Sequence, residues 1–206
     1  MGKVINNSKA AYRSFVISEL SRRGGIKNFL FYQPTDLFIS ALRKYEYHFN
    51  SKGLWHKVLA VYYYRKYLSI SLKTGISIPK NTCDRGLTLY HYGSIVVNAA
   101  CQIGKNCCIM NNVNIGANQG SQKAPIIGDN VYIGPGAVLF GEITIADGCY
   151  IGANAVVNKS FTEPNSVIVG IPAKVIKTDP VHWWEKNGLK STKYEEKNPN
   201  SSIWKL

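Results

Sequence analysis

Acidic residues are scarce in this 206-residue chain. It has 12 Asp and Glu against 25 Lys and Arg, which gives a formal net charge of +13. The excess lies on the flanks: residues 1–73 hold 13 basic and 3 acidic side chains and residues 171–206 hold 7 and 4, whereas residues 74–170 balance at 5 and 5. Basic flanks favour partners that carry phosphate or other negative charge. No zinc-finger, helix-turn-helix or RNA-binding motif accompanies them, so we do not expect nucleic acid as a partner.

Long apolar runs and leader-like segments are also missing. The first residues, MGKVINNSKA, lack the apolar core of a signal peptide, and Asn6 stands where a myristoylation motif needs Ser or Thr. The most apolar N-terminal stretch, residues 54–72, is interrupted by His56, Lys57, Arg65 and Lys66, so it is too polar to span a bilayer. We therefore expect a cytoplasmic protein, with peripheral contact at the inner face of an anionic membrane as the alternative.

Cysteine motifs are the third absence. The chain has 5 cysteines but no Cys-x-x-Cys pair, which excludes the common zinc and redox motifs. Cys101, Cys107 and Cys149 fall on a repeated position that takes small side chains, where a free thiol acts as a compact apolar residue. We expect structural thiols and no metal site, with Cys108 facing outward.

What the chain does have is a six-residue rhythm between Val97 and Val157. Only Ser121 interrupts it, and the position after each aliphatic is usually Gly or another small or turn-prone residue. Neither a helix nor a half-buried strand has a period of six. A solenoid does, if each hexad forms one short strand and a turn and three hexads close a triangular coil. The aliphatic positions are Val97, Ile103, Ile109, Ile115, Ile127, Ile133, Leu139, Ile145, Ile151 and Val157.

The chain is predicted to have three parts. Residues 1–73 are predicted to be helical: Asp36 is placed to cap one helix, and a Ser-Lys-Gly break at 51–53 precedes a second helix over 54–72. Residues 74–170 are predicted to form a solenoid of roughly five coils, with residues 118–125 bulging from one corner as a loop. Residues 171–206 form an exit segment and tail.

The apolar and basic residues of 54–72 allow two interpretations. The apolar side could pack on the first coil while the basic side is solvated. Alternatively, Tyr62–Tyr64 with Arg65 and Lys66 could form a surface for a membrane or a polysaccharide. We favour packing, which would involve Trp55, Val58, Leu59, Tyr62 and Tyr63.

Of four histidines, His91 stands apart. His48 and His56 lie in the helical segment and His182 in the tail, whereas His91 lies in a β-rich stretch just before the regular coils. The Gly that follows at position 93 lets backbone come close. A His in a strand is commonly structural, but a neutral imidazole can also remove a proton from an alcohol. The residues alone leave both roles open.

The hexads, the segment from Tyr90 to Asn98 and the exit Gly170-Ile-Pro-Ala-Lys174 resemble the hexapeptide-repeat acyltransferases. The most similar branch contains serine acetyltransferases and capsular or surface-polysaccharide O-acetyltransferases. The resemblance covers residues 74–177. It implies a mainly β fold, a left-handed parallel β-helix of hexapeptide repeats after an N-terminal α-helical segment. It also implies a homotrimer with active sites between subunits, and acetyl-CoA as donor without a metal.

The resemblance further implies roles for individual residues. His91 matches the catalytic histidine, a general base for direct acetyl transfer, with backbone N–H groups to hold the oxyanion. Lys174 matches a basic residue near the CoA phosphates, and charge alone adds Lys159 and Lys177. An orienting partner for His91 could be Asp84, Asn98 or Asn112. Contacts along the pantetheine arm are implied for Gly116, Ala117, Gly134, Pro135, Gly152 and Ala153.

Three departures from the serine acetyltransferases bear on the acceptor. Tyr90 replaces an Asp before the catalytic His, Ala124 replaces a second active-site His, and Ser77 replaces an acidic residue of the first coil. These changes remove charged groups that would hold an amino acid. We therefore expect the acceptor to be a hydroxyl on a surface or capsular sugar or its lipid-linked precursor. The alternatives are a serine O-acetyltransferase and, in another class, a non-catalytic β-solenoid scaffold or binding protein.

Overall fold

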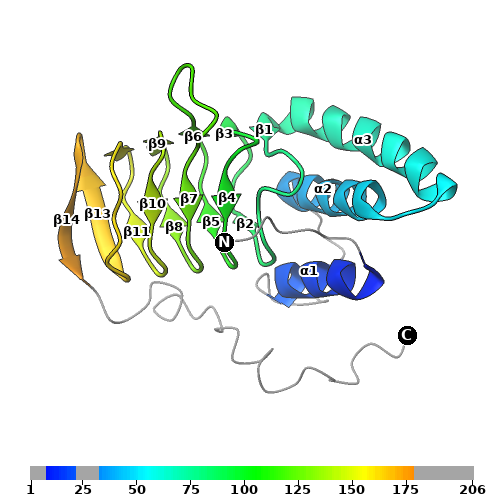
Figure 1. Cartoon of the computed structure of the whole chain (residues 1–206), viewed down its shortest axis with the longest axis horizontal. Helices are drawn as coiled ribbons and strands as arrows, with labels where there is room; N and C mark the ends of the chain where they lie inside the picture. Colours follow the sequence, from blue (N-terminus) through cyan, green and yellow to red (C-terminus); the bar gives the residue numbers. More distant parts are fainter. Residues whose placement is uncertain (1–7, 22–32, 179–206) are drawn as a thin grey trace.

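Helices pack against one end of a solenoid of short strands (Figure 1). The computed structural model describes residues 8–21 and 33–178. The helices there are α1 (Lys9–Ser21), α2 (Pro34–Asn50) and α3 (Leu54–Thr74). His182 and the rest of the predicted tail beyond Thr178 lie outside the described residues.

The strands form three sheets, one for each side of the solenoid. Sheet A contains β1 (Ile76–Ser77), β3 (Ile95–Val97), β6 (Val113–Gly116), β9 (Val138–Phe140) and β12 (Val156–Val157). Sheet B contains β4 (Gln102–Ile103), β7 (Ile126–Ile127) and β10 (Thr144–Ile145). Sheet C contains β2 (Thr88–Leu89), β5 (Cys108–Ile109), β8 (Tyr132–Ile133), β11 (Tyr150–Ile151), β13 (Ser166–Gly170) and β14 (Ala173–Thr178).

Register and burial confirm the prediction of a left-handed parallel β-helix built from hexads. Tyr132 pairs with Tyr150 and Val138 with Val156, so partners stand 18 residues, or three hexads, apart (150 minus 132). All pairs are parallel except the final hairpin of β13 and β14. Every aliphatic of the predicted phase is buried, and Ile109 and Ile133 pair in register with no exposure. The stacked aliphatics are therefore the core.

The predicted loop adds the length of one whole hexad to its coil. Gln102 pairs with Ile126, which is 24 residues on (126 minus 102) rather than 18. The extra six residues leave the coil between the end of β6 and the start of β7, and this loop projects beyond the prism in Figure 1. A full hexad outside the coil explains why Ser121 breaks the pattern although the phase continues.

All five cysteines are free thiols and are buried. Cys101, Cys107 and Cys149 belong to the main core, as their place in the repeat predicts. Cys108 lies outside that core, on the outer face of sheet C, where Met110, Tyr132 and Tyr150 pack against it. Its thiol faces outward as expected but is covered by these neighbours.

Helix α2 begins earlier than the sequence suggested. Its first residue is Pro34, which suits the first turn because proline needs no donor there. The Asp36 carboxylate accepts a hydrogen bond of 3.0 Å from the N–H of Gln33, so Asp36 caps the helix from within its first turn. Helix α3 ends at Thr74. The next residue, Gly75, caps it with a φ of 71°, and its N–H donates to the carbonyl of Ser71.

The expected packing of α3 on the first coil is wrong for most of the residues named for it. Among them only Tyr63 packs against the core, while Trp55 is 79% exposed and Tyr62 58%. The buried stripe of α3 instead contains Ala60, Tyr67 and Thr74. The helix is apolar on more than one side, so sequence could not tell which side meets α2. No helix within 8–21 or 33–178 is long and apolar enough to cross a membrane.

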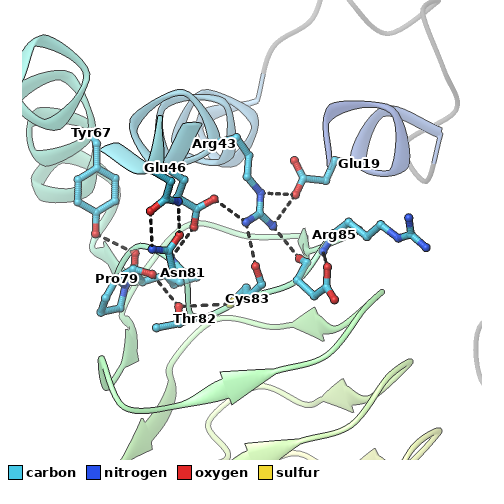
Figure 2. A network of polar contacts seen from close by, with 12 residues as sticks. Glu19, Arg43, Glu46, Tyr67, Pro79, Asn81, Thr82, Cys83 and Arg85 are labelled. Carbon is cyan, nitrogen blue, oxygen red and sulfur yellow. Dashed lines mark hydrogen bonds and ion pairs between the residues drawn. The ribbon is translucent and has the colours of Figure 1, made fainter. Parts of the chain in front are cut away.

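The helices close the first edge of the solenoid, where the opening coil has no coil before it. An open edge leaves backbone groups without partners, and repeat proteins need a cap there. Side chains of α2 and α3 supply those partners (Figure 2). The bonds run from Ser71 Oγ to Ile76 O, from Tyr67 OH to Ile78 O, from Asn81 N–H to Glu46 Oε1, and from Arg43 to Cys83 O and Asp84 O.

Arg43 is the centre of this cap and is fully buried. Its Nε donates to Glu19 of α1 at 2.8 Å, and its Nη1 donates to Glu46 at 2.9 Å (Figure 2). Burial alone works to lower the pKa of Arg43, but the two carboxylates outweigh burial and the pKa is raised. The guanidinium therefore stays charged and ties α1, α2 and the first coil together.

Candidate active site

The three sheets meet at three edges, which we name by the sheets they join. The CA edge connects sheet C to sheet A, the AB edge connects A to B, and the BC edge connects B to C. Residues at one edge of successive coils lie one above the other, since the coils are in parallel register. These edges decide which predicted site residues lie near each other in one protomer.

His91 lies at the CA edge, between the end of β2 and the start of β3. Its side chain is exposed and does not enter the core. Tyr90 and Tyr92 on either side are 48% and 63% exposed. An exposed imidazole between two accessible aromatic rings can meet a substrate, which a core histidine could not.

The next coils place other predicted residues above His91 on the same edge. Asn112 follows β5, with a φ of 58° at the turn. Gly134 and Pro135 follow β8, and Gly152 and Ala153 follow β11. The CA edge therefore brings together His91, one of its three candidate partners and four of the candidate cofactor contacts.

Gly134 and Gly152 are required by the coil geometry itself. A Cβ at Gly134 would meet the backbone N of Ala153 at 2.8 Å, and one at Gly152 would meet Val169 Cγ1 at 2.7 Å. Their N–H groups donate at 2.8 Å to the carbonyls of Ile151 and Ile168 in the next coil. Because Pro135 has no N–H, the exposed Ala153 is the one position of the four with an amide that can point to a ligand.

The AB edge carries a second group of predicted residues. Asn98 follows β3, Gly116 and Ala117 lie at the base of the loop, and Lys159 follows β12. The side chain of Asn98 accepts a hydrogen bond of 2.9 Å from the N–H of Ala100, so it serves its own turn. Sheet A separates this edge from His91 within one protomer.

Asp84, Lys174 and Lys177 lie in still other places. Asp84 is at the BC edge, where its carboxylate accepts the N–H of Arg85 and its carbonyl accepts Arg43. Lys174 and Lys177 are exposed on β14, at the far end of the solenoid. Asn112 is thus the one candidate partner that shares an edge with His91.

A tyrosine ladder beside His91 is a feature that the sequence analysis missed. Tyr132 and Tyr150 pair in register on the outer face of sheet C, with ring centroids 4.5 Å apart and planes at 8°. Burial, then the neighbouring Tyr150 and Cys108, raises the pKa of Tyr132, and Tyr90 adds to the shift. Tyr90 directly follows β2 of the same sheet and directly precedes His91. The sequence signal was a Tyr directly before each of two inward Ile residues, Ile133 and Ile151, which are 18 positions apart.

The thiols are poor candidates for covalent chemistry. Burial raises the pKa of Cys83 to about 12 and that of Cys101 to about 11. A buried protonated thiol is a weak nucleophile. Within the described ranges, no three or more His, Cys, Asp or Glu side chains gather as a metal site would require.

Comparison with known proteins agrees with this geometry. The model of the bacterial transferase hexapeptide family (six repeats) matches residues 124–159. Solved serine acetyltransferases share the fold: the soybean apoenzyme matches with a TM-score of 0.65 at 26% identity, over 81% of this chain and 69% of that one. Residues 124–159 thus carry the hexapeptide repeat of bacterial transferases, on a fold that the chain shares with solved serine acetyltransferases.

Relatives by sequence carry the name serine acetyltransferase, and two of them show how much of each chain is covered. The one from Staphylococcus xylosus is 36% identical over 109 residues, which cover 52% of this chain and 50% of that protein. The one from Buchnera aphidicola subsp. Schizaphis graminum is 31% identical over 147 residues, which cover 68% and 55%. The chain thus spans about half the length of the curated relatives it matches. These names favour the serine alternative over a polysaccharide acceptor, which none of them supports.

A further solved structure extends the agreement in fold alone. The serine acetyltransferase of Neisseria gonorrhoeae matches with a TM-score of 0.67 at 22% identity, over 89% of this chain and 73% of that one. The match covers more of this chain than the repeat alone, and so includes helical residues before the solenoid.

Proposed function

We propose that this protein is an acetyl-CoA-dependent O-acetyltransferase in which His91 is the general base. The observation that carries the proposal is the exposed His91 at the CA edge, directly in line with the turns that contain Pro135 and Ala153. The serine acetyltransferases to which the chain is similar support the reaction class.

In this mechanism His91 works on the acceptor rather than on the donor. The neutral imidazole accepts the proton of the acceptor hydroxyl while the hydroxyl oxygen forms a bond to the thioester carbonyl carbon. The carbon–sulfur bond then breaks, and the imidazolium returns the proton to the departing sulfur. The buried thiols take no part, because no enzyme-bound acyl group is needed.

Asn112 is the proposed positioning residue for His91, because it shares the CA edge. For the donor, the amide of Ala153 is the proposed contact along the pantetheine arm, beside Gly134, Pro135 and Gly152. Lys159, Lys174 and Lys177 are the proposed cations for the CoA phosphates. They lie on the AB edge and on β14, away from His91 within a protomer. A homotrimer, with the donor bound between neighbouring prisms, would allow different protomers to supply these groups.

Serine is the first acceptor to test, because the relatives by sequence bear that name. An uncharged sugar hydroxyl is the second candidate. It is favoured by the aromatic Tyr90 and Tyr92 around His91 and by Ala124, which is only 6% exposed and offers no charge. Aromatic surfaces suit a sugar ring better than they suit an ammonium and carboxylate pair that needs ionic partners.

The decisive experiment measures CoA thiol release from acetyl-CoA with L-serine and with a panel of sugars and nucleotide sugars. The enzyme proposal predicts that His91→Ala lowers acetyl transfer by about 10²- to 10⁴-fold while the melting temperature is unchanged. His56→Ala is the matched control, because it removes an imidazole on α3, away from the CA edge. If the His91→Ala protein keeps full acetyl transfer, His91 is not the general base. No thiol release with any acceptor, by either protein, would favour the scaffold alternative.

A further inference from the structure

The outer side of α3 carries a largely exposed apolar stripe. Its members follow a 4-3-4-3-4 spacing, which places them on one line along a helix. Leu54 and Leu72 at the ends are 76% and 78% exposed, Val58 and Val61 are 54% and 59% exposed, and Leu68 is 41% exposed. Arg65 occupies the remaining position. An exposed apolar stripe of this length marks an interaction surface.

The stripe is separate from the face that holds α3 to the protein. Ala60, Tyr67 and Thr74 are buried, and Tyr63 and Ile70 pack partly against the core. This buried face has its own 3-4-3-4 spacing on the opposite side of the helix. In Figure 1, α3 is the outermost helix, with α2 between it and α1. The stripe is thus directed away from the molecule rather than toward the solenoid.

The charges of α3 indicate what covers the stripe. The helix carries Lys57, Arg65, Lys66 and Lys73 and no Asp or Glu. Trp55 and Tyr62, 79% and 58% exposed, lie beside the stripe. Apolar residues flanked by Lys, Arg, Trp and Tyr are the composition of a helix that lies in the interface of an anionic membrane.

We propose that α3 docks the protein on an anionic lipid surface, with the Leu54–Leu72 stripe in the acyl boundary and the four cations at the phosphates. Arg65 fits this arrangement, because its long side chain can reach from within the stripe to the headgroups. Over 21 residues the helix presents about 31 Å of this surface. Each Lys or Arg near an anionic surface strengthens binding about fivefold.

A second copy of the chain is a less suitable partner for the same stripe. Two α3 helices face to face would bring eight cations together without one acidic residue on either helix. Coiled-coil pairs normally use opposite charges beside the seam. Lipid phosphates supply the missing negative charge, whereas a second α3 does not.

Vesicle co-sedimentation of the full chain tests the proposal. We expect binding to phosphatidylcholine vesicles that contain phosphatidylserine, weaker binding to phosphatidylcholine alone, and release at about 1 M salt. Leu54→Gln/Leu72→Gln should weaken binding by about tenfold or more. Both leucines are exposed, so the fold should persist. The matched control is Leu37→Gln, which removes a leucine of 45% exposure from α2.

A charge series gives a second, independent test. Arg65→Gln/Lys66→Gln should weaken binding by about 25-fold at low salt, whereas Lys9→Gln/Arg13→Gln on α1 makes the same change in net charge and should have little effect. The proposal is overturned if the native protein does not bind anionic vesicles, or if all four variants bind them as strongly as the native protein does. If native protein stays off vesicles while Leu54→Gln/Leu72→Gln lowers the mass of the assembly in ultracentrifugation, a second copy covers the stripe instead. None of these readouts depends on acetyl transfer.

Discussion

Replacing Arg43 by Ala should loosen the helices from the solenoid. Arg43 is fully buried and bonds to Glu19, Glu46 and the carbonyls of Cys83 and Asp84. Its removal leaves two buried carboxylates without their cation and two edge carbonyls without a donor. Breaking a buried ion pair by removing one partner costs about 3 to 5 kcal/mol. For a chain of this size, that loss lowers the melting temperature by about 6 to 20 °C.

Thermal unfolding followed by circular dichroism measures this loss. Lys44→Ala is the matched control, because Lys44 is the next residue on α2 and makes only a 5.8 Å contact over the ring of Tyr63. Its effect should stay within about 0.5 kcal/mol. A melting temperature for Arg43→Ala within error of the Lys44→Ala value would refute the assignment of Arg43 as the centre of the cap.

A triple variant separates the charge network from the cap. Glu19→Leu/Arg43→Met/Glu46→Leu removes all three charges together, and such exchanges are often neutral or stabilising. In this protein the melting temperature of the triple variant should stay below the native value, since the N–H of Asn81 and the carbonyls of Cys83 and Asp84 still lose their partners. Full recovery to the native melting temperature would mean that those edge bonds contribute little.

Three further predictions concern stability. His48 Nδ1 lies 2.9 Å from His56 Nδ1, and burial, then the charge of His56, lowers the pKa of His48. The unfolded chain therefore takes up more protons as pH falls below about 6.5, so the free energy of unfolding should fall there. His48→Asn should reduce the difference between the urea unfolding midpoints measured at pH 7.5 and 5.5. Gly134→Ala places a Cβ 2.8 Å from backbone and should cost about 1 to 3 kcal/mol in denaturant unfolding, whereas Gly116→Ala, 3.3 Å from one side chain, should cost much less; equal losses would contradict the coil-contact argument. Ile109→Ala should cost about 2 to 5 kcal/mol, since Ile109 is fully buried between coils; a loss under about 1 kcal/mol would mean that the prism collapses around the gap.

The repeat was predictable because its signal is local and redundant. Each hexad contributes an inward aliphatic and a small residue four positions on, so an error in one hexad leaves the others in phase. Even the loop around Ser121 was predictable, because a whole hexad left the coil. The position of His91 outside the core does not follow from that phase, because counting six residues back from Val97 reaches position 91. Leu89 pairs with Ile109 and Val97 with Ile115, so the turn that holds His91 is two residues longer than in the next coil.

The packing of the helices and the grouping of the site residues were not predictable, because both depend on contacts between residues far apart in the chain. Helix α3 is apolar on two sides, and only its contact with α2 decides that Tyr67 is inside and Trp55 outside. Asp84, Asn98 and Asn112 looked equivalent in sequence, but the coils put them on three different edges. Arg43 and Glu19 are 24 residues apart, and no pattern signals that they meet.

The amino-acid order alone determined that this chain winds into a prism of hexads, because neither a helix nor a half-buried strand has a period of six. Tertiary structure decided that His91 is exposed and which turns stack above it, how the buried guanidinium of Arg43 closes the first coil, and which side of α3 is left for a partner. Those outcomes depend on contacts between residues far apart in the chain, and a periodicity carries no information about them.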